Sequence, residues 1–188
     1  MPRRDEQVTT DSEAVIEIRR GDAGDAASLA ELGARTFYET FAADNTPEDM
    51  AAYLSSAFTP ELLAQELADP RSCFFVAEAA GEAVGYAKLH AGEAPDGVRG
   101  DKPVELARLY VAQEWLGRGV GPELMRACLA EARAGGHRTV WLGVWEHNHR
   151  ARAFYRRLGF RDVGAKIFVV GFDEQTDTVM ELSLDGPN

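Results

Sequence analysis

Apolar positions along the chain change repeatedly between the spacing of a helix and that of a strand. Within residues 25–42, Leu29, Leu32, Phe37 and Phe41 fall on one face of a helix. Short apolar runs bounded by glycine, proline or aspartate indicate strands. The pattern predicts strands at residues 15–19, 73–79, 83–91, 105–111 and 139–144, and helices at residues 25–42, 50–54, 60–67, 122–134 and 148–158. Residues 92–103 are rich in glycine, proline and aspartate and are predicted to form a loop.

Three glycines alternate with other residues directly after the strand predicted at residues 105–111. Residues 116–122 read Leu-Gly-Arg-Gly-Val-Gly-Pro and lead into a helix. Glycines let several backbone N–H groups approach one anion, and the start of a helix adds the positive end of its dipole. A dinucleotide-binding turn would instead require Gly-x-Gly-x-x-Gly and an acidic residue after the next strand, and neither is present. The segment therefore predicts a binding site for the phosphates of another cofactor, although such glycines also occur in plain turns.

A second informative segment covers residues 145–160. Asn148 can cap the start of its helix, and Gly159 suits the left-handed residue that ends one. Apolar residues recur at i, i+3, i+4 and i+7, which predicts a single buried stripe. The stripe consists of Ala151, Phe154, Tyr155 and Leu158.

Together, the two segments resemble the GNAT superfamily of acetyl-CoA-dependent N-acetyltransferases. Residues 118–121 match its pyrophosphate loop, whose pattern begins with glutamine or arginine, whereas this chain has Leu116 there. Residues 148–160 resemble the second signature of the family, and the resemblance covers residues 74–184. It implies an α/β (α+β) fold with a mixed, mostly antiparallel twisted sheet of about seven strands, flanked by helices on both faces.

Further segments are similar to bacterial spermidine/spermine N-acetyltransferases. They are residues 36–41, 46–50, 105–111, 141–146, 175–177 and 179–181. This similarity implies transfer of an acetyl group from acetyl-CoA to a primary amine, a polyamine or another small cationic amine, by direct attack within a ternary complex. A protein lysine or N-terminal acetyltransferase is an alternative with the same chemistry. A non-catalytic acyl-CoA-binding sensor is an alternative of another class.

The GNAT resemblance also implies roles for single residues. An alkylamine with a pKa near about 10.4 is mostly protonated at pH 7, so a base assists the reaction. Glu105 falls at the position of a catalytic glutamate that acts through water, and a solvent-facing strand glutamate is the equally open interpretation. Tyr155 falls at the position of the general acid for the departing thiolate, and otherwise it is an aromatic residue of the core. The implied cofactor-binding residues are Leu109, Tyr110, Val111, Gly117, Arg118, Gly119, Val120, Gly121 and Asn148.

The formal charge of −11 is unevenly distributed along the chain. Residues 1–104 hold 20 acidic and 9 basic side chains, whereas residues 105–188 hold 11 of each. An acidic surface repels nucleic-acid phosphates and attracts cations, so no nucleic-acid partner is expected; ordinary surface acidity explains the same charge. Acidic loops at residues 43–50 and 171–177 are expected to border the acceptor end of the cleft. Within them, Asp173 and Glu174 are the candidate residues for binding a cationic substrate.

Length and composition set the remaining expectations. With 188 residues and 45% hydrophobic content, the chain fits a single domain, placed at residues 14–188 after a flexible tail at residues 1–13. No signal-peptide core or apolar run of transmembrane length is present, so a cytoplasmic protein without a membrane partner is expected. Cys73, Cys128, His147 and His149 lack the spacing of metal ligands, and no metal is expected. Whether the chain forms a homodimer is left open.

Overall fold

A computed structural model describes residues 15–185, and the tail expected at residues 1–13 lies outside them. Its strands are β1 (Ile16–Arg20), β2 (Ser72–Ala79), β3 (Glu82–His90), β4 (Pro103–Val111), β5 (Thr139–Trp145), β6 (Arg161–Val170) and β7 (Asp173–Ser183). Its α-helices are α1 (Ala26–Phe41), α2 (Pro47–Ala57), α3 (Pro60–Ala68), α4 (Val120–Ala134) and α5 (His149–Arg157). Two 3-10 turns, η1 (Ala23–Asp25) and η2 (Gln113–Trp115), precede α1 and follow β4.

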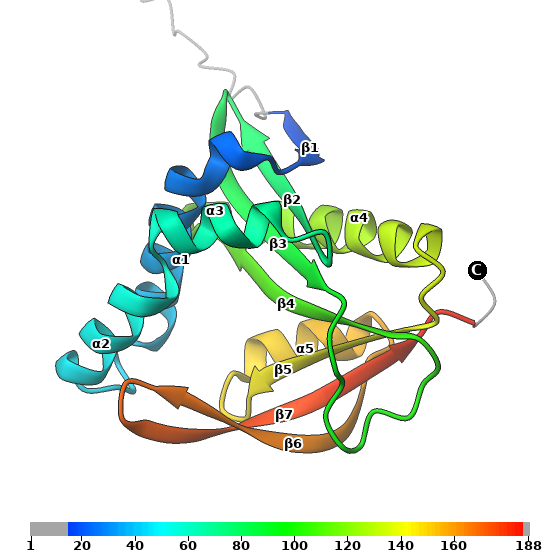
Figure 1. Cartoon of the computed structure of the whole chain (residues 1–188). Helices are drawn as coiled ribbons and strands as arrows, with labels where there is room; N and C mark the ends of the chain where they lie inside the picture. The colour runs from blue at the N-terminus through cyan, green and yellow to red at the C-terminus, as the bar shows by residue number, and fades with distance from the viewer. Residues whose placement is uncertain (1–14, 186–188) are drawn as a thin grey trace, which may run out of the picture.

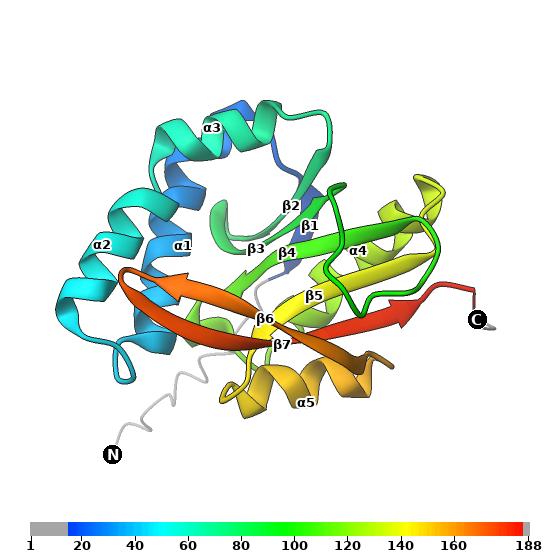
Figure 2. The same cartoon turned by 60° about the horizontal axis from the view of Figure 1, so that its bottom comes forward.

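The seven strands form one sheet in the order β1-β2-β3-β4-β5-β7-β6. Every neighbouring pair is antiparallel except β4 and β5, which run parallel. One core cluster joins α4 and α5 to one face of the sheet, and a second joins α1 and α3 to the other face. Figure 2 shows α1, α2 and α3 gathered on one side and α5 on the opposite side. The expected mixed, mostly antiparallel sheet with helices on both faces is confirmed.

The sheet opens in its middle, between β4 and β5. These strands pair only over residues 103–105 of β4 and 139–141 of β5. Beyond this short seam they move apart, as Figure 1 shows. On the other side of β4, the pairing with β3 skips Ala107, which forms a bulge. A bulge bends and twists its strand, so β4 turns away from β5 after the seam.

The hairpin of β6 and β7 differs from the expected loop at residues 171–177. Only Gly171, with a φ of 62°, and Phe172 form the turn, and β7 already begins at Asp173. Lys166 of β6 pairs with Asp177 of β7. Residues 173–177 have no apolar alternation, because this end of β7 lies at the rim of the sheet, and the sequence pattern therefore did not reveal the strand.

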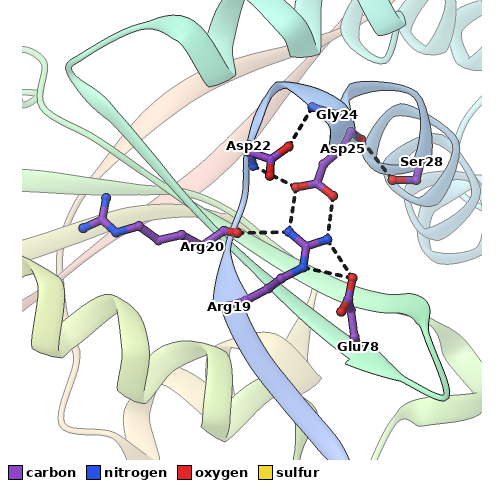
Figure 3. A network of polar contacts seen from close by, with 7 residues as sticks. All are labelled: Arg19, Arg20, Asp22, Gly24, Asp25, Ser28 and Glu78. Carbon is purple, nitrogen blue, oxygen red and sulfur yellow. Dashed lines mark hydrogen bonds and ion pairs between the residues drawn. The ribbon is translucent and has the colours of Figure 1, made fainter.

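An ion-pair network fixes the position of α1 (Figure 3). The Arg19 guanidinium of β1 donates to both carboxylate oxygens of Asp25, at 2.6 and 2.8 Å, and to Glu78 of β2 at 2.6 Å. Asp25 is only 8% exposed, and its hydrogen bonds with Arg19 hold the pKa of this carboxyl below its ordinary value. The Asp25 carboxylate also accepts from the backbone N–H of Asp22. The network ties η1, and therefore the start of α1, to the first two strands.

None of the helices within residues 15–185 is both long enough and apolar enough to span a membrane.

Candidate active site

A cavity of about 260 Å³ lies at the opening between β4 and β5. Its walls come from β4, β5, β6 and β7, from α1 on one face of the sheet, and from the start of α5 on the other. Residues 106 and 108–111 of β4 pair with β3, and none of residues 106–111 has a partner on β5. The cavity is therefore reached by side chains from both faces, and one edge of β4 faces an opening in place of a neighbouring strand.

Glu105 lies in the wall of this cavity, at the closed end of the opening. Its side chain is 21% exposed, and its Oε1 lies 3.6 Å from the Lys166 Nζ. Lys166 comes from β6, and its ammonium lies 5.2 Å from the centre of the Trp141 ring. Glu105 therefore occupies a charged, half-buried environment in the cavity and does not lie on an open surface of the strand.

Tyr155 enters the cavity from α5, on the opposite face of the sheet from α1. It is 9% exposed, and its ring packs against Phe154 and Phe160. Burial raises the pKa of the Tyr155 phenol, so the hydroxyl stays protonated at neutral pH and can donate a proton or a hydrogen bond. Both interpretations of the sequence are compatible with this placement, since the side chain belongs to the core and also lines the cavity.

Asn148 positions α5 at the cavity. Its Oδ1 accepts a hydrogen bond from the Ala151 N–H at 3.0 Å and caps the helix as expected. Leu109 and Tyr110 of β4 also line the cavity. Val111 ends β4 and is paired with β3, and it is not part of the cavity wall.

The glycine-rich turn lies beyond the end of β4, outside the cavity wall. Gly117 and Gly119 have φ values of 79° and 87°, and a Cβ on either would meet no atom within 4 Å. Gly119 directly precedes α4, whose first N–H groups, on Val120 and Gly121, lack intrahelical partners. The Arg118 guanidinium lies 5.3 Å from the centre of the Trp115 ring. Left-handed glycines with open space in front of a helix start fit an anion that approaches the backbone closely.

Of two further charged residues of the cavity, Lys166 was not predicted as a site residue, and Asp177 was expected only as part of the acidic loop at residues 171–177. Asp177 of β7 and Lys166 of β6 both line the cavity. A Cβ on Gly143 would collide with the Lys166 Cε and lie 2.9 Å from the Asp177 Oδ2, so a larger residue there would displace the ends of both side chains. The sequence signal that could have identified the aspartate is its spacing from Val179, because residues two apart lie on the same face of a strand.

The two predicted substrate residues lie elsewhere on the hairpin. Asp173 and Glu174 are exposed and do not line the cavity. The Asp173 Oδ2 accepts a hydrogen bond from Gln175 at 3.0 Å, and Gln175 is a residue of the cavity wall. The acidic pair is therefore placed next to the cavity, one residue beyond its wall.

A buried ion cluster supports the floor of the cavity. The Glu66 carboxylate of α3 accepts from Arg108 of β4 at 3.2 Å and lies 3.0 Å from the Lys88 Nζ of β3. Lys88 is only 8% exposed, and burial lowers the pKa of its ammonium. Arg108 lies in the cavity wall, with its guanidinium 5.5 Å from the centre of the Phe58 ring. One carboxylate thus holds two cations together beneath the site.

The described part of the chain offers no cluster of three or more histidine, cysteine, aspartate or glutamate side chains that could hold a metal ion.

Comparison with known proteins extends these observations. Residues 33–160 match the model of the acetyltransferase (GNAT) family. An uncharacterized N-acetyltransferase from the pepI 3′ region of Lactobacillus delbrueckii subsp. lactis is 35% identical over 153 residues, which cover 81% of this chain and 88% of that protein.

Two solved structures share the fold. The PaiA N-acetyltransferase from Thermoplasma acidophilum, in complex with coenzyme A, has a TM-score of 0.73 at 21% identity and covers 90% of this chain and 99% of its own. A structure from Salmonella typhimurium with its cofactor acetyl-CoA has a TM-score of 0.68 at 24% identity and covers 92% of this chain and 95% of its own. With the family model, the relative and the opened sheet in agreement, the chain belongs to the GNAT family of acetyl-CoA-dependent N-acetyltransferases.

Proposed function

We propose that this enzyme acetylates a small cationic primary amine of the polyamine class, by direct attack within a ternary complex. The observation that carries the proposal is the pair of carboxylates, Glu105 and Asp177, in the wall of one small cavity beside the opening between β4 and β5. The acidic side chains of residues 1–104 favour approach of a cation to the same molecule. The similarity of several segments to spermidine/spermine N-acetyltransferases supports the same substrate class.

The chain offers complementary positions for the co-substrate. Acetyl-CoA supplies the activated acetyl thioester. In the proposed arrangement, the turn of Gly117, Gly119 and Gly121 binds its phosphates, with Arg118 adding a charge-assisted contact. The unpaired edge of β4 is the place for the pantetheine arm, beside Val111, and the Leu109 N–H stabilises the developing oxyanion.

The two candidate catalytic side chains face this edge from opposite sides. Glu105 accepts a proton from the incoming amine through water, and Tyr155 gives a proton to the departing thiolate. Tyr155 suits this role because its hydroxyl stays protonated in the buried cavity. The amine enters from the side of α1, where Thr40 and Phe41 line the cavity.

The Tyr155→Phe variant tests the assignment of the general acid, since it removes one oxygen and keeps the packing of the ring. We expect kcat to fall about 100-fold, within the range of general acid catalysis, while the affinity for coenzyme A stays the same. Thiol release and calorimetric binding of coenzyme A measure the two quantities. Unchanged turnover would leave Tyr155 as a core residue only, and coenzyme binding without turnover of any acceptor would favour the acyl-CoA sensor.

A panel of acceptors tests the substrate class. We expect spermidine and spermine to be acetylated in preference to neutral amino acids, aminoglycosides and basic peptides. The Asp173→Asn and Glu174→Gln variants should raise KM for spermidine and leave kcat unchanged, since both residues lie outside the cavity wall. Equal turnover of neutral acceptors would contradict the polyamine proposal, and selective turnover of basic peptides would favour a protein acetyltransferase.

A further inference from the structure

Asp177 is a buried carboxylate that faces the cavity. It is 7% exposed, and it lies on the face of β7 that also carries Gln175 in the cavity wall. Its cross-strand neighbours are Trp145 of β5 and Lys166 of β6. Three strands therefore position this side chain, and Gly143 leaves the space it occupies.

Within residues 15–185, Asp177 receives no hydrogen bond from another side chain or from the backbone, and no cation lies within 4.0 Å of its carboxylate. The other strongly buried carboxylates differ in this respect. Asp25 is paired with Arg19, and Glu181 accepts from Arg161 at 2.7 Å. Buried charges in folded proteins are normally paired. An unpaired one that faces a cavity indicates that its partner comes from a ligand.

The charged and titratable groups around Asp177 come from three elements, β4, β6 and α2. Lys166 of β6 acts on it as a nearby cation, and Glu105 of β4 is already paired with the same lysine. Tyr110 of β4 and Tyr53 of α2 are close enough to interact with its charge. The nearest cavity residues of α1 and β5, Thr40, Phe41, Gly143 and Trp145, carry no charge.

Burial raises the pKa of Asp177 from its ordinary value of 3.8 to about 6, and the Lys166 charge opposes this shift. The carboxylate is therefore a stronger base than an exposed aspartate and is still ionised at neutral pH. An ammonium group supplies three hydrogen-bond donors and a positive charge. Among residues 15–185, the Asp177 carboxylate has neither a hydrogen-bond donor nor a close cation as its partner.

We propose that Asp177 binds the ammonium group of the acceptor and takes its first proton, and that Lys166 sets the pH range in which it does so. The inference rests on the proposed function and adds to it a second carboxylate of the acceptor site. Glu105 is the less available group, because its charge is partly neutralised by Lys166.

The reaction consumes one ammonium and one thioester and releases one proton overall. Asp177 takes one proton from R–NH3⁺, and the free nitrogen pair then forms a bond to the thioester carbonyl carbon as the C–S bond breaks. When the amide forms, the nitrogen loses its second proton through water to Glu105, and Tyr155 gives its proton to the thiolate. Glu105 then returns a proton through water to the Tyr155 phenolate, so both groups regain their starting state. Asp177 afterwards releases its proton to water, so one amide, one thiol and one free proton are produced.

The kinetic test compares four variants over pH 5–9 with saturating acetyl-CoA and spermidine as the probe amine. We expect kcat/KM of the wild type to decline below a pH near 6. Asp177→Asn should lower kcat/KM at least about 100-fold and abolish this decline. Lys166→Met should move the decline to higher pH, because a cation that favours the ionised carboxylate is removed. Lys166→Arg keeps the positive charge and should return the decline to the pH seen for the wild type. Asp96→Asn, at an exposed loop position, is the matched control and should behave as the wild type.

A second measurement does not depend on turnover. In ¹³C NMR spectra of the free protein, the Asp177 carboxyl, assigned by its loss in Asp177→Asn, should titrate near pH 6. Addition of coenzyme A and spermidine should lower this midpoint, since a bound ammonium stabilises the carboxylate. If no amine is acetylated but the midpoint still moves, the proposed function fails and the ammonium site stands. Wild-type kinetics in Asp177→Asn, or a midpoint that spermidine does not move, would overturn the inference.

Discussion

At the scale of single residues, Asp177 should reduce the stability of the fold that holds it. Its pKa is raised in the folded state, so the folded protein binds the proton more tightly than the unfolded chain. Stability should therefore fall as the pH rises from about 4 to about 6. We expect Asp177→Asn to raise the free energy of unfolding by up to roughly 3 kcal/mol at pH 8 and to have little effect below pH 4. Urea unfolding at several pH values measures this, and a difference that does not depend on pH would contradict it.

Residue roles could be predicted from the sequence where they depend on neighbours along the chain. Asn148 was expected to cap a helix, and its side chain does so by accepting a hydrogen bond from the Ala151 N–H. Asp177 was placed in an acidic loop beside the cleft but was not singled out, because its burial depends on pairing with Trp145 and Lys166, which are distant in the sequence. The acidic residues chosen in its place, Asp173 and Glu174, are exposed, and composition alone does not separate exposed from buried carboxylates.

At the scale of elements, the two ends of α4 offer a matched pair of substitutions. Gly119 before the helix and Gly136 after it both have positive φ values, 87° and 75°, and open space around the Cβ position. Alanine at either position should cost about 1 kcal/mol of stability, because an L side chain disfavours this backbone conformation. Only Gly119→Ala should also weaken the binding of coenzyme A, measured by calorimetry. If Gly119→Ala and Gly136→Ala bound coenzyme A equally well, the phosphates would have to bind elsewhere than at this turn.

Helices with capping residues and strands with continuous apolar runs were predictable. Thr46 and Thr59 accept hydrogen bonds at the starts of α2 and α3, and proline follows each of them, which is a local signal. The strands β6 and β7 were expected only through the family resemblance, since exposed residues interrupt their pattern. The bulge at Ala107 has no signal in the sequence, because it results from the register between β3 and β4.

At the scale of the whole molecule, the sheet consists of two parts joined by a short seam. The strands β1 to β4 form one part and β5 to β7 the other, with pairing between them over three residues of each strand. Acetyl-CoA bound along β4 would contact both parts and should stabilise the whole fold. At a concentration 100 times its Kd we expect a gain of about 2.7 kcal/mol and a rise in Tm of roughly 5–10 °C.

Thermal unfolding with and without acetyl-CoA checks this expectation. The Gly119→Ala variant is the control, and its Tm should rise less at the same concentration of acetyl-CoA. An unchanged Tm of the wild type at millimolar acetyl-CoA would contradict binding across the opening. The global arrangement itself could be predicted only through the family resemblance, because no local pattern encodes where two parallel strands separate.

The opening between β4 and β5 is closed at one end, where residues 103–105 pair with residues 139–141, and narrows toward this junction. The glycine-rich turn follows the wide end, so a cofactor bound there points its thioester toward the narrow end, where Glu105 pairs with Trp141. Each carbon added to the acyl chain would have to occupy a place nearer to this junction. We therefore expect the enzyme to prefer short acyl groups, because the backbone pairing of β4 and β5 closes the opening at this end.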